Sequence, residues 1–384
     1  MWINSEIYVF FLLGYYLLKN LFLDEEYIRF FKFRDVTWWI VLLTLILYII
    51  ILRVNIRFKL RLNLLFFFLI LLLMTSRFLI FYLVYEIIFV LIIFVIILLG
   101  YSYERLIAAY LILFYSFLFS RPLMILFLFF DYRFLIKQWL SYRIIVRYFL
   151  VGSFIVKFPI FGFHYWLPVA HVEASTIGSI LLAGILLKLG SVGLFYVVFY
   201  LNFIVKFHWL RLRILLVIAI ILLLRDLKII IAYSSVAHIT LVFYVIRTGA
   251  WVAKKGALVI IFYHGYLSPL IFWLVGLLAW WKTRSLFVVK FITVSFIFFI
   301  LIFILRIINI SFPPFIGFLR EILILKSLVL YPCILIVFVF GVLFSCYYNI
   351  YFFWAFSGSG IQFKVNFFGL DMFIFLLWVL FLNF

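Results

Sequence analysis

Long apolar runs, separated by short polar and basic stretches, recur from one end of the chain to the other. An α-helix needs about 20 apolar residues to cross the hydrocarbon core of a bilayer. The runs lack the alternation of apolar and polar positions that is typical of membrane β-strands. We therefore predict an all-α polytopic membrane protein with about thirteen transmembrane helices. The expected spans are 7–23, 36–52, 60–76, 78–99, 106–130, 144–163, 176–201, 208–224, 229–247, 252–280, 288–308 continuing to 331, 333–354 and 368–384.

Prolines interrupt two of these runs. Lys157-Phe158-Pro159 lies within one run, and Pro313-Pro314 lies within another. Proline removes a backbone donor and clashes with the carbonyl four residues back, so backbone groups are left that protein or water must satisfy. A simple kink is the alternative interpretation. Because each break adjoins an ionisable residue, we instead predict two broken helices that line a polar cavity.

Four ionisable side chains lie within or beside the apolar runs: Glu86, Lys157, Lys188 and Glu321. Lys188 is about twelve residues, roughly 18 Å of helix, from either end of its run, which is farther than a lysine side chain reaches. A charge left in hydrocarbon costs at least about 2.5–3.5 kcal/mol. Four such groups in one chain indicate movement of protons or other charges through the membrane.

Composition narrows the class of protein. The chain is 71% hydrophobic and 11% charged. Its net charge of +20 falls in short patches between the expected spans, a pattern typical of loops that face anionic lipid, and we expect no nucleic-acid binding. The 55 Phe residues against 17 Gly residues indicate the coding bias of an AT-rich organellar genome. No cleavable presequence is evident, which a gene encoded within the organelle would explain.

Cofactor chemistry is not expected within this chain. The sequence contains no Gly-rich phosphate loop, no Rossmann fingerprint and no Cys-rich cluster motif, so we expect neither NADH, flavin nor an iron–sulfur cluster to bind here. His238 and His264 lie inside expected spans without the further ligands that a metal site requires. A membrane histidine often makes a helix–helix hydrogen bond, and a proton relay is the alternative role.

Ordered sequence blocks carry a resemblance to a known family. The chain reads YLVYE at 82–86, ERLIAA at 104–109, KFPIFGFHYWLPVAHVEAS at 157–175, LLKLG at 186–190, DLKIIIAYSSVAH at 226–238 and HGYLS at 264–268, and Glu321 follows Pro313-Pro314. Over residues 60–331 these blocks resemble antiporter-like subunit 4 of respiratory complex I (NADH:quinone oxidoreductase). The HVEA stretch at 171–174 and a glutamate at 321 favour subunit 4 over the related subunits 2 and 5.

The resemblance implies an architecture of antiporter-like inverted repeats within a single membrane domain, residues 1–384. The proton-translocating core would be 60–331, preceded by divergent N-terminal helices at 1–59 and followed by C-terminal helices at 332–384. Val169 and Ser175 depart from the family pattern, which usually has a polar residue and a proline there. Arg320 also departs, because a small residue usually precedes the glutamate.

The physical properties of the buried groups and the resemblance assign the same roles. Two unit charges 4 Å apart gain roughly 4 kcal/mol at an effective dielectric of about 20, which is comparable to their desolvation penalties. Such a pair is poised to exchange a proton. We expect Glu86 and Lys157 to form the input pair, Lys188 to be the central relay and Glu321 to be the terminal acceptor. The relay histidines would be His238 and His264, and Glu173 would either couple to a neighbouring subunit or cap a helix.

The implied partners are the other membrane-arm subunits of complex I and membrane lipids, with cardiolipin as a candidate. Ubiquinone would be a partner only at the level of the complex, whose activity is proton-translocating NADH:ubiquinone reduction. Two alternatives stay open. One is a subunit of a free-standing multisubunit cation/proton antiporter. The other is a scaffold subunit whose buried charges only fix the packing of helices.

Overall fold

The structure is a computed structural model. It describes residues 44, 47, 59–74, 78–100, 103–129, 144–195, 210–247, 251–279, 292–293, 296–313, 315–329, 332–355 and 361–362. The described residues all belong to one compact unit, 40–384. The expected spans 7–23 and 368–384 lie outside the described residues, as does 36–52 apart from the helical residues Thr44 and Leu47.

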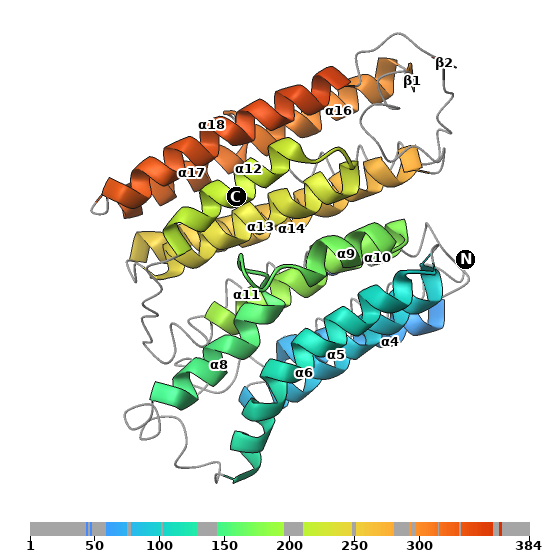
Figure 1. The fold of residues 1–384 in the computed structure, drawn as a ribbon, viewed down its shortest axis with the longest axis vertical. Coiled ribbons are helices and arrows are strands. Elements are labelled where there is room, and N and C mark those ends of the chain that lie inside the picture. Colours follow the sequence, from blue (N-terminus) through green and yellow to red (C-terminus); the bar gives the residue numbers. More distant parts are fainter. Residues whose placement is uncertain are drawn as a thin grey trace, which may run out of the picture. The chain divides into compact units, whose positions relative to one another are not determined.

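Helices make up nearly all of the described structure (Figure 1). They are α4 (Lys59–Met74), α5 (Phe78–Leu99), α6 (Arg105–Phe129), α8 (Ile144–Lys157), α9 (Trp166–Glu173), α10 (Thr176–Leu181), the π-helix η2 (Leu182–Leu186), α11 (Leu187–Phe195), α12 (Leu210–Leu223), α13 (Leu227–Arg247), α14 (Trp251–Ala279), α16 (Phe296–Ile310), α17 (Ile316–Leu328) and α18 (Pro332–Ala355). Two-residue strands β1 (Ile292–Thr293) and β2 (Ile361–Gln362) pair in parallel, a small departure from the all-α prediction.

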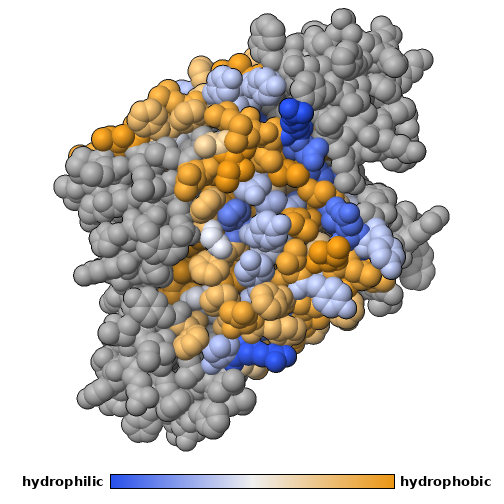
Figure 2. Space-filling model, viewed as in Figure 1, coloured by the Kyte–Doolittle hydropathy of each residue, from blue (hydrophilic) through white to orange (hydrophobic). Residues whose placement is uncertain are grey.

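Within the part of the chain that the structure describes, three helical segments are long and apolar enough to cross a membrane: Ile80–Leu99, Thr176–Phe195 and Lys255–Gly276. Helix α5 shows why. Its apolar side chains occur all round the helix, so that Ile92 is fully buried while Phe94 is 56% exposed. Apolar side chains also cover much of the described surface on the face in Figure 2. Such a surface is stable against lipid, where apolar exposure carries no penalty.

Every residue from Ile177 to Phe195 is buried, so this segment lies in the interior of the unit. Its parts α10 and η2 pack against α14, and α11 packs against α8. Helix α14 also packs along α13 and α17 (Figure 1). Lys188, in the first turn of α11, is therefore held in the interior by helices from both earlier and later parts of the chain.

Both predicted breaks are confirmed. Helix α8 ends at Lys157, two residues before Pro159, and the chain passes through turns before α9 begins at Trp166. Helix α16 ends at Ile310 and α17 begins at Ile316. The sequence did not predict the π-turn at Leu182–Leu186, which divides the expected span 176–201.

Candidate functional site

Glu86 and Lys157 form an ion pair, as the sequence predicted. Glu86 lies in the third turn of α5, and Lys157 is the last residue of α8, so the broken helix presents its terminal side chain to α5. The side chain of Lys157 is fully buried, whereas that of Glu86 is 22% exposed. The pair thus joins an interior cation to a carboxylate that is partly open to the surroundings.

Aromatic rings of α5 surround the ammonium group of Lys157. Its Nζ lies 4.2 Å from the ring centroid of Tyr85, 4.9 Å from that of Phe89 and 5.6 Å from that of Tyr82. A cation over an aromatic face is attracted by the ring quadrupole, and the attraction grows where water is excluded. These rings therefore help to hold a charged lysine in an apolar interior.

Gly190 explains how α11 comes close to this pair. A Cβ atom at this position would lie 3.2 Å from the carbonyl carbon and oxygen of Lys157 and from the amide nitrogen of Phe158. A larger residue would push α11 away from the end of α8. The glycine two residues after Lys188 thus brings the segment that carries the central lysine against the helix end that carries Lys157.

Lys188 is 3% exposed and has three polar contacts. Its Nζ donates to the carbonyl oxygen of Ala183 at 2.5 Å and to Ser268 Oγ at 3.4 Å, and it lies 2.9 Å from His264 Nδ1. Ala183 belongs to the π-turn, where the wider winding alters the usual helical pairing of carbonyl groups. The π-turn therefore supplies a backbone acceptor to the buried lysine.

His238 and His264 extend the polar contacts of Lys188 toward α13. Their ring centroids are 5.5 Å apart, and His264 of α14 lies between Lys188 and His238 of α13. A cavity beside them is lined by Lys188, Ser191, His238 and His264, with about 10 Å³ open to a water centre, which is room for roughly one water.

A second cavity shares His238 and leads to the predicted terminal acceptor. Its polar lining consists of Ser234, His238, Arg320, Glu321, Ser345 and Tyr348. About 50 Å³ is open to water centres, which is room for roughly three or four waters. One cavity thus lies beside Lys188 and the other beside Glu321, and His238 lines both.

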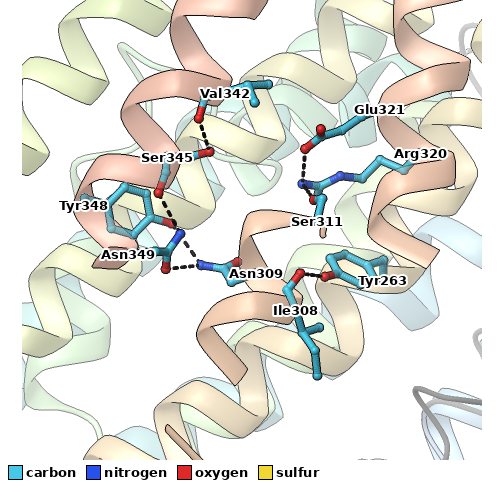
Figure 3. Close-up of polar contacts among 10 residues, drawn as sticks. All are labelled: Tyr263, Ile308, Asn309, Ser311, Arg320, Glu321, Val342, Ser345, Tyr348 and Asn349. Atoms are coloured by element: carbon cyan, nitrogen blue, oxygen red, sulfur yellow. Dashed lines mark hydrogen bonds and ion pairs between the residues drawn. The ribbon is translucent and has the colours of Figure 1, made fainter. Parts of the chain in front are cut away.

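Glu321 pairs with the residue before it in the sequence. Arg320 Nη2 lies 3.5 Å from Glu321 Oε1 and donates to Ser311 Oγ at 2.7 Å (Figure 3). Adjacent side chains on a helix do not normally face each other, and the contact forms here because the long arginine side chain folds back toward the break before α17. The structure thus brings Glu321 together with His238 across a cavity and with Arg320 in direct contact.

Glu173 and Lys228 lie at the C-terminal end of the short helix α9. Glu173 is the last residue of that helix and is 7% exposed. Lys228 Nζ donates to the carbonyl oxygens of Val172 and Ala174 at 3.3 and 2.9 Å, which satisfies groups at the C-terminal end of α9. No role was predicted for Lys228, although the DLK sequence that contains it was noted.

Two further buried groups were not predicted as functional. His171 of α9 is fully buried and stacks on Phe272 of α14, with ring centroids 4.3 Å apart. Asn309 of α16 donates to Asn349 Oδ1 and to the hydroxyl of Tyr348 of α18, at 2.9 and 3.0 Å (Figure 3). The two asparagines lie inside apolar runs, and this was the sequence signal that could have predicted the cluster of Asn309, Tyr348 and Asn349.

No group of three or more potential metal ligands occurs among the residues that the structure describes. The histidines instead contact a lysine, aromatic rings and each other. The site is an arrangement of proton donors and acceptors on α5, α8, α11, α13, α14 and α17.

Comparison with known proteins identifies the family of this chain. Residues 75–346 match the profile of NADH:quinone oxidoreductase/Mrp antiporter transmembrane proteins. The chain belongs to this family. The match extends from the start of α5 into α18, so it includes Glu86, Lys157, Lys188 and Glu321.

Curated relatives are named NADH-ubiquinone oxidoreductase chain 4. The protein from Locusta migratoria is 35% identical over 305 residues, which is 74% of this chain and 67% of the relative. That from Ceratitis capitata is 33% identical over 299 residues, 73% of this chain and 66% of the relative. The chain spans about two thirds of the length of these relatives.

Solved structures share the fold at lower identity. A chain of respiratory complex I from Thermus thermophilus matches with a TM-score of 0.72 and 20% identity, covering 90% of this chain and 78% of that one. A chain of the Mrp complex from Dietzia sp. DQ12-45-1b matches with a TM-score of 0.65 and 18% identity, covering 80% and 37%. The fold is therefore shared with chains of both complexes.

Proposed function

We propose that this chain is a proton-translocating membrane-arm subunit of respiratory complex I. The observation that carries the proposal is the set of ionisable groups Glu86–Lys157, Lys188, His264, His238 and Glu321, in which one cavity lies beside Lys188, a second lies beside Glu321, and His238 lines both. Each group can bind or release a proton, and the cavities have room for the waters that would connect them. Similarity to chain 4 relatives supports the respiratory assignment.

The proposed transfer begins at Glu86, whose side chain is partly exposed. A proton that reaches this carboxylate neutralises it and weakens the attraction that holds the charge on Lys157. Lys188 then passes its proton by way of His264 and His238 to Glu321, the neutral Lys188 takes up the proton of Lys157, and Lys157 regains a proton from Glu86. Each step moves one proton between neighbouring groups and leaves the total number of protons unchanged. Glu173, at the end of α9, would couple these changes to a neighbouring subunit.

Electron transfer would occur elsewhere in the complex. We propose that this chain binds no NADH, flavin, iron–sulfur cluster or metal, and takes part in NADH:ubiquinone reduction only as a coupled subunit. Its partners would be neighbouring antiporter-like subunits and lipids such as cardiolipin, in the mitochondrial inner membrane. About thirteen spanning helices and the inverted repeats are part of the same proposal, supported by family membership.

Two experiments test this proposal in turn. On a native gel of gently solubilised membranes, this chain should migrate in a large band that stains for NADH dehydrogenase activity. Lys188→Met should then reduce proton translocation in vesicles by roughly a hundredfold, because the central donor is lost, and should slow coupled quinone reduction. Full translocation by an assembled Lys188→Met complex would show that Lys188 is not a relay.

The matching Mrp complex supports one alternative function, a subunit of a multisubunit cation/proton antiporter. That function predicts migration of the chain in a smaller complex without NADH dehydrogenase activity. It also predicts sodium-dependent proton exchange in vesicles that are given no NADH. Detection of both would replace the respiratory assignment.

A further inference from the structure

Arg320 is a buried cation at the break between α16 and α17. It is 4% exposed, and its guanidinium group has three described contacts (Figure 3). Nη2 donates to Ser311 Oγ at 2.7 Å and lies 3.5 Å from Glu321 Oε1, while the guanidinium carbon lies 5.1 Å from the ring centroid of Tyr263. Arg320 thus contacts the break, helix α14 and the carboxylate at the same time.

The break itself is a constrained segment of backbone. Ser311 has a φ of 67°, a conformation that non-glycine residues seldom adopt and that needs support from the surrounding structure. The bond from Arg320 supplies part of that support. Tyr263 supplies another part, because its hydroxyl donates to the carbonyl oxygen of Ile308 in the last turn of α16. The arginine is therefore fixed from two sides, and a fixed arginine limits where Glu321 can lie.

The chemistry of arginine differs from that of the relay groups. A guanidinium group keeps its proton at any accessible pH, so it neither donates nor accepts in a transfer. Its constant positive charge instead favours the ionised form of a neighbouring carboxyl group. Among the described residues, the other titratable groups near Glu321 are His238 from α13 and Tyr348 from α18, which line the same cavity, together with Tyr263 from α14 and Cys346 from α18.

We propose that Arg320 is the positioning residue for Glu321. It holds the carboxylate at the wall of the cavity shared with His238 and supplies a permanent countercharge between proton arrivals. Arrival of a proton neutralises Glu321 and leaves Arg320 with its contacts to Ser311 and Tyr263, which keep the break in place until the proton leaves. The inference rests on the proposed role of Glu321 as an acceptor.

The test is a double-mutant cycle in the assembled complex, with protons translocated per NADH oxidised as the readout. Arg320→Gln should lower this ratio roughly tenfold, the size expected for loss of one charge-assisted interaction. Arg320→Lys keeps the charge but loses the forked geometry, so we expect a loss of only about threefold. In a Glu321→Gln background, Arg320→Gln should add less than about a twofold change, because the group that it positions is already absent.

Arg306→Gln is the matched control. Arg306 of α16 is equally buried at 4% exposure, and its Nη1 donates to Asn349 Oδ1 at 3.2 Å.

If Arg320 serves only to pack the bundle, the effects of Arg320→Gln and Glu321→Gln multiply, and Arg320→Lys is no better than Arg320→Gln. Either result overturns the inference. An unchanged ratio for Arg320→Gln also overturns it.

The cycle separates this inference from the proposed function. An unchanged ratio for Glu321→Gln alone removes Glu321 from the pathway and refutes both. A large loss for Glu321→Gln with no loss for Arg320→Gln leaves the pathway intact and refutes only the positioning role. If Arg320→Gln fails to assemble on a native gel, Arg320→Lys replaces it in the cycle, and its threefold loss should likewise disappear in the Glu321→Gln background.

Discussion

The two ion pairs of the site are built in opposite ways. Glu86 and Lys157 come from α5 and α8, 71 residues apart in sequence, and meet through tertiary packing. Arg320 and Glu321 are consecutive residues of α17, and their contact depends on the break before that helix. The first pair has a lysine whose side chain is fully buried, and the second has an arginine whose side chain is 5% exposed.

The difference in cation decides what each pair can do. Lysine can lose its proton when burial disfavours the charged form, so Glu86 and Lys157 can both become neutral by exchanging one proton. Arginine cannot, so a neutral Glu321 always leaves a buried positive charge beside it. A pair that can neutralise itself suits the start of a transfer. A pair with one permanent charge suits a group that must lose its proton again.

The largest expected effect comes from replacing the lysine of the first pair with arginine. Lys157→Arg keeps the positive charge opposite Glu86 but removes the ability to release a proton. Proton translocation should fall roughly a hundredfold, within the range for loss of a general acid or base. NADH-driven acidification of vesicles is the measurement. Arg320→Lys is the comparison, with its much smaller expected loss, and equal tolerance of both exchanges would remove the distinction between the pairs.

A smaller effect is expected on assembly when the first pair is neutralised. Lys157→Met alone leaves Glu86 without its cation and should lower the amount of assembled complex severalfold. Glu86→Gln together with Lys157→Met removes both charges, so assembly should return to within about twofold of the original. Native-gel band intensity measures assembly.

Proton translocation by the same double variant decides between a relay and a scaffold. A relay predicts that translocation stays lost although the complex assembles. Recovery of translocation along with assembly would mean that these charges only fix helix packing, as the scaffold alternative requires.

The smallest expected effects concern two of the glycines that allow close approach, Gly190 and Gly317. At Gly190 a Cβ would meet the backbone of Lys157 and Phe158 at 3.2 Å, whereas at Gly317 it would meet the ends of the Ser311 and Tyr263 side chains at 2.9 Å. Backbone yields less easily than side-chain ends. Gly190→Ala should therefore destabilise the complex by about 1–3 kcal/mol, and Gly317→Ala by less. Heating the solubilised complexes and following the loss of the assembled band on a native gel ranks the two variants by stability. If Gly317→Ala proves the less stable variant, the break before α17 is the more rigid region.

Hydrophobic patterning predicted the helices because the length of an apolar run limits where a membrane helix can begin and end. Helix α5 matches the expected span 78–99, and α14 and α18 match theirs within a residue or so. The prolines similarly located both breaks. The π-turn at Leu182–Leu186 was missed because its residues are as apolar as those of an ordinary helix. Lys228 was missed because its partners are backbone carbonyls of a distant helix.

The sequence by itself determined that four ionisable groups lie within or beside long apolar runs, because the composition of a run can be read without its tertiary contacts. It also determined family membership, through ordered motifs. The tertiary structure alone decided that Lys188 faces His264, that His238 borders two cavities and that Arg320 turns back to Glu321. Those contacts join helices far apart in sequence or depend on the backbone of a broken helix, and hydrophobic patterning contains no information about either.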